Sequence, residues 1–484
     1  DVDFRVESNG NANMLFVDGG NDTVGIGTTE GNIFETAGTA NEFGVQSSGT
    51  NMGAIIAVGA TGTGFSGIDI GTTDLRRGGI YTLDGSHLVF YTNASNSGDS
   101  LTERMRIASD GSISTPTAGT SNTRLGVNAG NSIVSGTNYN VLIGDEAGTA
   151  LNSGDSNVAV GYASGDALTS GTLNTFVGTA AGGAAQTVND NTAIGAYAFD
   201  AGTGANNTAV GSGALGGASN TGTHNVAMGK DAGNSISSGG YNVLLGSLAG
   251  DGITEGASNV AIGYHSQGNN DLGSHNVSVG HGSLEALNPA TATDMYNTGV
   301  GSKAGNAITT GLSNTLVGGL AGDAITTGTE NTAIGQSALT ADTLGGQNVA
   351  IGAGTLQTQN FSSTTTDAGN TAVGTYAGAS ITTGIYNTLV GRAAADALSD
   401  ADYNVAVGGY SLSTDTLGSK STAIGYGALS TQNFTTATDS FNTAVGYETG
   451  VAVTTGRYNS IMGALAGDAL NTGAGHTVLG YSAL

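Results

Sequence analysis

The amino-acid sequence predicts an all-β protein in which a parallel β-solenoid follows small β modules. Three observations predict this class: a short motif recurs through the last three quarters of the chain, glycine makes up 85 of 484 residues, and only 2 residues are proline. So much glycine without proline or a Gly-X-Y period excludes a collagen helix. Because 38% of the residues are hydrophobic, the chain has apolar surface to bury, and a repeat architecture remains.

The recurring motif is a pentapeptide of the form Asn-[Thr/Val]-x-aliphatic-Gly. It occurs 21 times from residue 122 onward if Ser421 and His476 are counted in place of the Asn and Ser460 in place of the Thr or Val. Of the 20 intervals between copies, 14 are 17 residues long. Such a period indicates a solenoid with one coil per repeat, so we predict that residues 121–484 form a β-solenoid of 21 repeats of about 17 residues. The motif Gly fits a corner that needs positive φ or close backbone approach. The motif Asn fits a ladder of side-chain amides that caps turns from coil to coil.

We number positions from the motif Asn, so that the three strand residues are +1, +2 and +3. The β-branched and aliphatic residues at +1 and +3 share one strand face, which we predict to be the core of the coil. Position +2, usually Ala or Leu, faces the other way, and we predict that it contacts neighbouring chains. The predicted core residues are Val158, Val160, Ile194, Ile262, Val317 and Ile334. The predicted contacts between chains are Leu142, Ala159, Phe176, Leu244, Leu316 and Leu389.

The predicted contact face also predicts an oligomeric state. Left exposed, the +2 side chains would form an apolar stripe along the whole rod, larger than the patch that a soluble monomer tolerates. Three chains around one axis bury all three stripes, whereas a two-fold pair more readily leaves open edges. We therefore expect a homotrimer.

Residues 1–120 lack the motif. The stretches DFRVES, MLFVDG, HLVFYT and RMRIAS alternate like half-buried strands, separated by Gly, Asn and Asp turns. We predict a β-rich fibre segment on the attachment side in residues 1–34 and a small β module in residues 35–120, with the boundary to the solenoid near residues 115–121.

Charge and composition exclude several classes of partner and chemistry. The chain has 37 acidic and 11 basic residues, a net charge of −26, and such a surface repels nucleic acid and anionic lipid. No apolar run of about 18 residues is present, so we expect no membrane insertion. The absence of cysteine removes disulfides, zinc–thiolate sites and thiol nucleophiles. No carboxylate pair, Ser-His-Asp order or phosphate loop stands out, so we expect no catalytic, cofactor-binding or metal-binding residues.

The tyrosines of the repeat region have a regular placement. All fourteen flank the motif, at −1, +5 or +6. Their favoured role is packing over the coil corners, since packing also demands regular spacing. The alternative is a tyrosine-lined acidic surface on which sugar rings stack. The candidate glycan contacts are Tyr139, Tyr241, Tyr296, Tyr386, Tyr403 and Tyr458.

The pentapeptide resembles the head repeat of YadA-type trimeric adhesins, whose signature is Asn-Ser-Val-Ala-Ile-Gly. Residues 156–161 (SNVAVG) and 258–263 (SNVAIG) match it nearly residue for residue. The resemblance covers about three quarters of the chain and implies a left-handed parallel β-roll with three chains packed side by side. The repeat of this chain is longer, 17 residues against roughly 14 in the adhesins, so the loops differ.

The N-terminal third resembles a different family. The segments DFRVESNGNANMLFVDGGNDTVGIGT and LTERMRIASDGSIST look like parts of bacteriophage tail fibres that end in an endosialidase-type intramolecular chaperone, and repeats such as NTAIGQSAL and NTLVGGLAG often follow in those proteins. The implied chaperone does not follow Leu484, so we expect that self-cleavage removed it or that the chain is truncated.

Together the two resemblances imply a structural and adhesive fibre, a phage tail fibre that contacts the host cell surface. The implied partners are virion or baseplate proteins at the N-terminal region and a host surface glycan or protein. The alternatives are a bacterial YadA-type adhesin or extracellular filament and, least favoured, a glycan-cleaving tailspike. The expected location is the virion or the extracellular space.

Overall fold

The computed structural model describes residues 121–484 apart from residue 218, together with residue 119 and the strands between residues 4 and 114. In that N-terminal part, side chains are described at residues 79–81, 87–92 and 102–108. The chain divides into two compact units, one of residues 1–125 with 132–143 and the other of residues 126–131 with 144–484. Every described element is a strand, so the chain is all-β over the described residues.

Two antiparallel sheets occupy the N-terminal region. One has the order β1-β2-β3 and the other the order β10-β9-β8-β7-β6-β5-β4. Each of the four predicted strand stretches overlaps a strand, namely β1, β2, β8 and β9. The predicted limits of the segments 1–34 and 35–120 fall largely outside the described residues. The strands are β1 (Phe4–Ser8), β2 (Asn11–Asp18), β3 (Thr23–Gly25), β4 (Ala40–Val45), β5 (Ala54–Ala60), β6 (Ser66–Thr72), β7 (Leu75–Leu83), β8 (His87–Asn93), β9 (Leu101–Ile107) and β10 (Ile113–Ser114).

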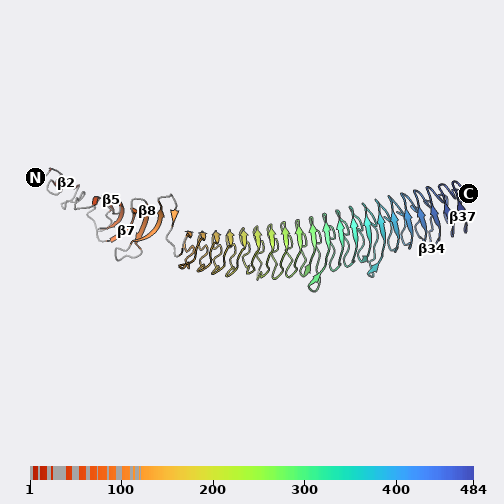
Figure 1. Cartoon of the computed structure of the whole chain (residues 1–484), viewed down its shortest axis with the longest axis horizontal. Helices are drawn as coiled ribbons and strands as arrows, with labels where there is room; N and C mark the ends of the chain where they lie inside the picture. Colours follow the sequence, from red (N-terminus) through yellow and green to blue (C-terminus); the bar gives the residue numbers. More distant parts are fainter. Residues whose placement is uncertain are drawn as a thin grey trace. The chain divides into compact units, whose positions relative to one another are not determined.

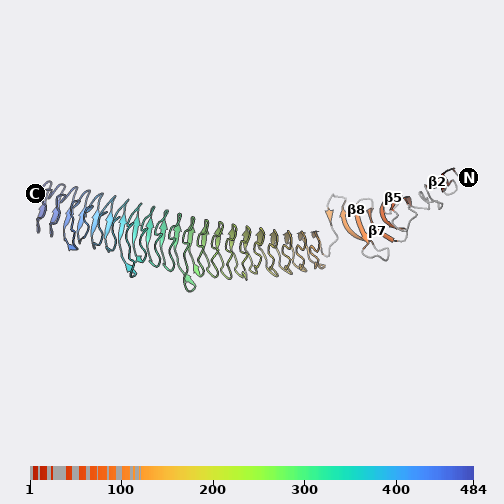
Figure 2. The same ribbon diagram turned by 180° about the vertical axis from the view of Figure 1, so that it is seen from behind.

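The repeats form a parallel β-solenoid whose motif strands make one 21-stranded sheet. The coils follow one another in single file, with the strands side by side along one wall (Figures 1 and 2). One coil per repeat is therefore confirmed. The strands are β11 (Thr123–Leu125), β12 (Val141–Ile143), β13 (Val158–Val160), β14 (Thr175–Val177), β15 (Thr192–Ile194), β16 (Thr208–Val210), β17 (Val226–Met228), β18 (Val243–Leu245), β19 (Val260–Ile262), β21 (Val277–Val279), β23 (Thr298–Val300), β24 (Thr315–Val317), β25 (Thr332–Ile334), β27 (Val349–Ile351), β29 (Thr371–Val373), β30 (Thr388–Val390), β31 (Val405–Val407), β33 (Thr422–Ile424), β35 (Thr443–Val445), β36 (Ser460–Met462) and β37 (Thr477–Leu479).

The motif Asn side chains form a ladder inside the coils, as the sequence predicts. The Oδ1 atom of Asn297 accepts the backbone N–H of Asn314 at 3.0 Å and its side-chain amide at 3.1 Å. The same amide of Asn314 donates to the carbonyl of Gly328 at 3.0 Å. These asparagines are fully buried, so the ladder satisfies backbone groups that would otherwise be orphaned in a dry interior.

The motif Gly is required at the corner for both predicted reasons. Gly161 has φ of 136°, in a region that L side chains rarely adopt. A Cβ at this position would also lie 2.5 Å from the carbonyl oxygen of Gly178 in the next coil. Because the corner glycines stack directly on each other, a side chain in one coil has no space beneath the next.

The assignment of the two strand faces is wrong, because the structure exchanges them. The predicted contacts between chains, Leu142, Ala159, Phe176, Leu244, Leu316 and Leu389, are at most 1% exposed and lie in the interior of the coil. The predicted core residues Val158, Val160, Ile194, Ile262, Val317 and Ile334 are half-buried or exposed on the outer side of the strand.

The physical reason for the exchange is the width of the coil. A coil of about 17 residues returns on itself so closely that each strand sends one side chain inward, toward position +11, which in most coils is a Leu or Ile such as Leu168. Where position +2 carries Phe176, the same coil has Ala185 at +11, and a Cβ on Gly182 would lie 2.7 Å from the Phe176 ring. Ala at +2 is therefore small because the interior of the coil is narrow.

Three longer loops interrupt the coils at intervals of four. Each adds a short strand that pairs in parallel with the coil before it, and the loops project from the same edge of the stack (Figures 1 and 2). The added strand pairs are β20 (Gly273–Ser274) with β22 (Thr293–Asp294), β26 (Gly345–Gly346) with β28 (Thr366–Asp367) and β32 (Gly418–Ser419) with β34 (Thr438–Asp439).

None of the described residues lies in a helix that could cross a membrane.

Candidate functional site

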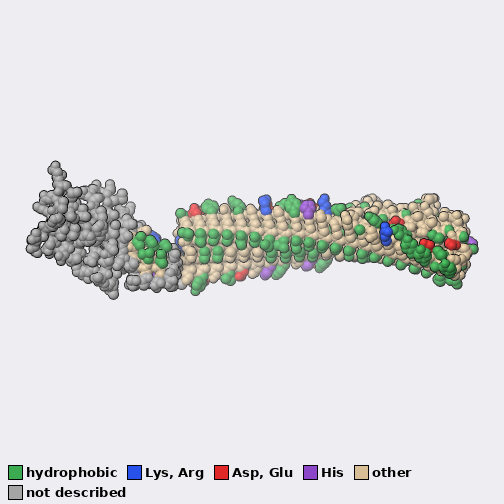
Figure 3. Space-filling model, turned by 90° about the horizontal axis from the view of Figure 1, so that it is seen from above, with side chains coloured by type: hydrophobic (Ala, Val, Ile, Leu, Met, Phe, Trp, Pro, Cys, Tyr) green, Lys and Arg blue, Asp and Glu red, His purple; other side chains and the backbone are tan. Residues whose placement is uncertain are grey.

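The outer side of the 21-stranded sheet is the most extended apolar surface that the structure describes. We call it the outer face and define it by positions +1 and +3 of each coil. Position +3 is Val, Ile, Leu or Met in every coil, and position +1 is Val, Thr or Ser. Figure 3 shows hydrophobic side chains in continuous rows along the solenoid. At position +3 the exposed fraction of the side chain is 41% at Ile194, 46% at Met228 and 53% at Met462, and it is 73% at Leu479 in the last coil.

No charged residue occupies the outer face. Neither position carries Asp, Glu, Lys or Arg in any coil, although the chain contains 48 such residues (37 acidic and 11 basic). A strand face that is exposed to water normally carries charged or strongly polar residues, whereas the core of a protein interface is depleted of charge. The sequence analysis predicts an exposed apolar stripe at position +2. The structure has such a stripe, but its residues are those at +1 and +3.

Two columns of side chains border the outer face. The leading column consists of the residues at −1, one before each motif Asn, and the trailing column of the residues at +5, one after each motif Gly. The tyrosines of the leading column are roughly half exposed, from 48% at Tyr386 to 63% at Tyr139 and Tyr241. The six candidate glycan contacts therefore lie along one border of the apolar surface, not on a separate face.

Rings of the leading column stack on their neighbours from coil to coil. The ring centroids of His224 and Tyr241 are 4.8 Å apart at 7° between planes, and those of Tyr386 and Tyr403 are 5.5 Å apart at 17°. Tyr296 stacks similarly on His275, and Tyr458 on Phe441. Five of the six candidates thus pack one ring face against a neighbouring coil, as the packing interpretation predicts, and a sugar could reach only the opposite face.

The trailing column contains a second series of rings near the C-terminal end. Tyr426 and Tyr447 stack with centroids 5.6 Å apart. At position +6 of the preceding coil, Tyr410 meets Tyr426 edge-on, and its hydroxyl accepts a hydrogen bond of 2.5 Å from Arg392 Nη1. Both borders of the outer face are therefore built from aromatic and basic side chains in this part of the rod.

Three titratable side chains from successive coils lie close together: Asp251 and Glu285 at position +9, and His265 at position +6 of the coil between them. Nδ1 of His265 is 3.1 Å from Glu285, and Nε2 of His265 is 3.9 Å from Asp251. Burial raises the pKa of Asp251, which His265 partly offsets. Within the described residues, Oδ1 of Asp251 has no hydrogen-bond partner, and no set of three or more His, Asp or Glu side chains is arranged to hold a metal ion.

Two carboxylates inside the solenoid were not singled out from the sequence. Asp342 and Asp415 occupy position +11, where most coils carry Leu or Ile, and neither is exposed. Asp342 accepts hydrogen bonds from Gln359 Nε2 at 2.7 Å and from the N–H of Gly345 at 2.9 Å, and Asp415 repeats this arrangement with Gln432 and Gly418. Burial raises the pKa of both carboxyls. The break in the Leu/Ile pattern at +11 was the available signal.

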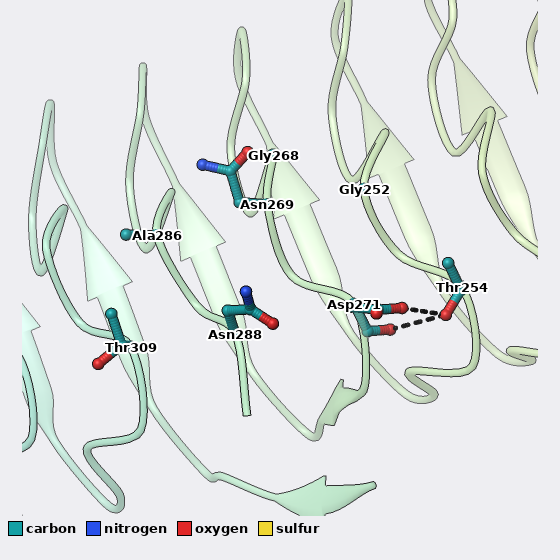
Figure 4. Close-up of a pocket in the computed structure, with 8 residues that line it drawn as sticks. All are labelled: Gly252, Thr254, Gly268, Asn269, Asp271, Ala286, Asn288 and Thr309. Carbon is teal, nitrogen blue, oxygen red and sulfur yellow. Dashed lines mark hydrogen bonds between the residues drawn. The ribbon is translucent and has the colours of Figure 1, made fainter. Parts of the chain in front are cut away.

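A shallow polar groove crosses four successive coils away from the strand (Figure 4). Its volume is about 520 Å³, and Thr254 donates to Asp271 on one wall while Asn269 and Asn288 expose their amides. Its lining residues are Gly252, Thr254, Gly268, Asn269, Asp271, Ala286, Asn288 and Thr309. The groove offers hydrogen-bond donors and acceptors but no ring and no basic group.

Comparison with known proteins adds no family to this description. No family model matches the sequence, and neither the curated proteins nor the solved structures gave a significant match.

Proposed function

We propose that this chain is a structural and adhesive fibre protein, a bacteriophage tail fibre that forms a homotrimer and contacts the host cell surface. The observation that carries the proposal is the uncharged, half-exposed outer face along all 21 strands. A solenoid that exposes such a surface is not suited to remain alone in water. Association of three copies around an axis parallel to the rod would cover the three outer faces and leave a rigid shaft.

Fibre function also fits what the interior provides. The buried Asn ladder links successive coils except where Ser421 replaces the Asn, and the corner glycines of neighbouring coils stack closely, so we expect the shaft to resist local bending and fraying. The proposed attachment side is the N-terminal region, through virion or baseplate proteins. The resemblance of residues 156–161 and 258–263 to YadA-type head repeats, with its implied left-handed roll, supports both the trimer and the contact with a cell.

The direct test is the mass of the protein in solution, measured by light scattering coupled to size-exclusion chromatography. We expect three times 47.1 kDa at micromolar concentration. A mass of 47.1 kDa would refute the trimer. Electron micrographs of the purified source particle would then show whether the fibre belongs to a virion or to a cell surface.

Two alternatives remain to be tested beside the phage fibre. A bacterial YadA-type adhesin or extracellular filament would use the same trimeric shaft, and a membrane anchor encoded with it would favour this alternative. A glycan-cleaving tailspike is the least favoured, since it needs a pair of carboxyl groups about 5–9.5 Å apart in a substrate cleft. Release of reducing sugar from host polysaccharide would favour the tailspike.

The proposed ligand is a glycan or protein of the host surface. For a glycan, two regions of this chain offer suitable chemistry: the free ring faces of the leading column and the polar groove of Figure 4. Asn269→Ala with Asn288→Ala removes the amides of the groove, and Tyr139→Ala removes a ring with 63% exposure. Loss of cell binding in only one of these variants would identify the region used.

A further inference from the structure

We propose that the leading and trailing columns pair with each other between copies of the chain, coil by coil, so that copies associate in parallel and in register. The inference rests on the proposed association through the outer face, and it deepens that proposal by naming the side chains that fix polarity and register. It commits the borders of the outer face to one occupant, a second copy of this chain.

The first observation is that the two columns are complementary in size within single coils. Eleven coils carry a Tyr or Phe in one of the two columns, and in ten of them the ring is in one column only. In seven of these ten coils the other column carries Gly, Ala or Ser. The seven pairs, leading residue first, are Ser156 with Tyr162, Tyr241 with Ser247, Ser258 with Tyr264, Tyr296 with Ser302, Tyr403 with Gly409, Tyr458 with Ala464 and Gly475 with Tyr481.

The second observation concerns charge. In two of the remaining three coils the ring is matched with a cation, Tyr386 with Arg392 and Lys420 with Tyr426, and in the third Tyr139 is matched with Asp145. Aromatic rings attract guanidinium and ammonium groups that approach their faces. The coil with Phe441 and Tyr447 has rings in both columns, and the pairing between copies would there be ring on ring.

Contact within one chain does not account for this matching. A leading residue and the trailing residue of its coil are six positions apart with a motif strand between them, which separates their Cα atoms by roughly 15 Å or more at ~3.3 Å per residue. The rings contact other coils of their own column instead, as Tyr386 contacts Tyr403. The two columns therefore meet only if another copy brings them together.

Symmetry then selects the arrangement. Rotation about an axis parallel to the rod, with the outer faces turned toward that axis, brings the leading border of one copy against the trailing border of the next at the same height. A two-fold axis perpendicular to the rod would instead bring leading against leading, in reversed order. Only the first arrangement places the rings of nine of the ten single-ring coils opposite the small or basic residue of their own coil.

The pattern also penalises a shift along the rod. A slip by one coil would set rings against rings in four places, whereas pairing in register does so only at Phe441 and Tyr447. The four pairs would be Tyr139 with Tyr162, Tyr241 with Tyr264, Tyr403 with Tyr426 and Tyr458 with Tyr481. The opposite slip would set Ser258 against Ser247 and leave a gap. Register is therefore specified by the borders, because the outer face repeats almost identically from coil to coil and cannot specify it alone.

The test uses the absence of native cysteine. Ser313 and Gly319 are the leading and trailing residues of one coil, both small, and a Cβ on Gly319 meets only the carbonyl oxygen of Ser302 at 4.0 Å. The full chain carrying S313C and G319C is treated with a short bismaleimide. We expect covalent multimers on a denaturing gel, up to the number of copies given by the solution mass.

The matched control is S313C with Gly409→Cys, which moves the trailing thiol five coils along, roughly 24 Å at ~4.8 Å per coil. Pairing in register predicts that cross-linking falls at least tenfold in this control. A multimeric solution mass with equal cross-linking in both variants, or with none in the matched variant, would overturn the pairing and leave the trimer intact. A monomeric mass would overturn both proposals.

Discussion

The two sides of a single strand in this solenoid are both apolar, yet one is buried inside the coil and the other is exposed on its surface. Inward, Ala193 is fully buried and fits beneath its neighbours, with the Asn ladder beside it. Outward, the adjacent Ile194 is 41% exposed, and nothing in the described chain covers it. The side chains of the inner side are buried within one copy of the chain. Those of the outer side have the composition of an interface core, but one copy leaves them uncovered. Apolar character alone therefore does not say which side of a narrow coil is its core.

The largest expected effect comes from placing charges on either side of matched strands. Three coils carry Thr-Ala-Ile, namely β15, β25 and β33. Asp at the three inward alanines (Ala193, Ala333 and Ala423) buries unpaired carboxylates, and we expect each to cost several kcal/mol, roughly 3–5. The inward variant should lose its β-type circular dichroism at room temperature.

The outward counterpart substitutes Asp for Ile194, Ile334 and Ile424. We expect this variant to keep its β-type circular dichroism and to dissociate to folded single chains, because the carboxylates would crowd around the shared axis. A folded outward variant with an unchanged mass would remove the outer face from the interface. Loss of structure in the outward variant, even when it is monomeric, would restore the original assignment of the core.

The second prediction concerns the ladder that makes the inner side self-sufficient. Asn314→Ala removes the acceptor for the N–H and the amide of Asn331 and the donor to Gly328. We expect a loss of about 2–4 kcal/mol in the free energy of unfolding, since several buried groups lose partners together. Chemical denaturation of the variant checks this, with Ser313→Ala at the neighbouring exposed position as the control, for which we expect a change under about 0.5 kcal/mol.

The third prediction uses the carboxyls enclosed in the interior. The pKa of Asp342 and of Asp415 is raised above the ordinary value of 3.8, so the folded chain binds these protons more readily than the unfolded chain does. Their contribution to stability therefore increases as pH falls from neutral through the folded pKa, and it levels off below about 3.8.

The measurement compares unfolding at pH 7 and pH 4.5 in the parent and in Asp342→Asn with Asp415→Asn. We expect the variant to gain less stability on acidification than the parent. Acidic residues elsewhere are common to both proteins and cancel in the difference. An identical pH response in the two proteins would mean that these carboxyls lose little solvation in the folded chain.

The smallest expected effect is at the border of the outer face. Tyr241→Ala removes the ring that stacks on His224, and we expect the single chain to lose about 0.5–1.5 kcal/mol. Made in the outward Asp variant, the substitution measures this contact alone. Made in the otherwise unchanged protein, it should cost more, because the ring would also contact a second copy. An equal cost in the two backgrounds would argue that the border does not contact another chain.

The sequence predicted the solenoid, its period and the roles of the motif Asn and Gly, because each depends on a local requirement repeated 21 times. The direction of the strand side chains could not be read in the same way. Val158 and Ala159 both suit a buried strand, and only the width of the closed coil, a property of its whole path, decides which one turns inward. The coil of Phe176 held a clue, since its bulky +2 residue comes with Ala185 at +11.

The candidate site was likewise only partly predictable: local placement could be read from the sequence, and features that depend on the closed coil could not. The placement of the tyrosines beside the motif was visible in the sequence, but their relation to the apolar surface depended on which strand face points outward. The buried carboxyls of Asp342 and Asp415 depend on partners in the next coil, Gln359 and Gln432, whose approach requires the coils to be stacked in register.

The central claim is that the outer face is covered by other copies of the same chain, and the solution mass tests it most directly. Light scattering at micromolar concentration should give three times 47.1 kDa for the unchanged protein and close to 47.1 kDa for the folded outward Asp variant. A mass of 47.1 kDa for the unchanged protein would contradict the claim.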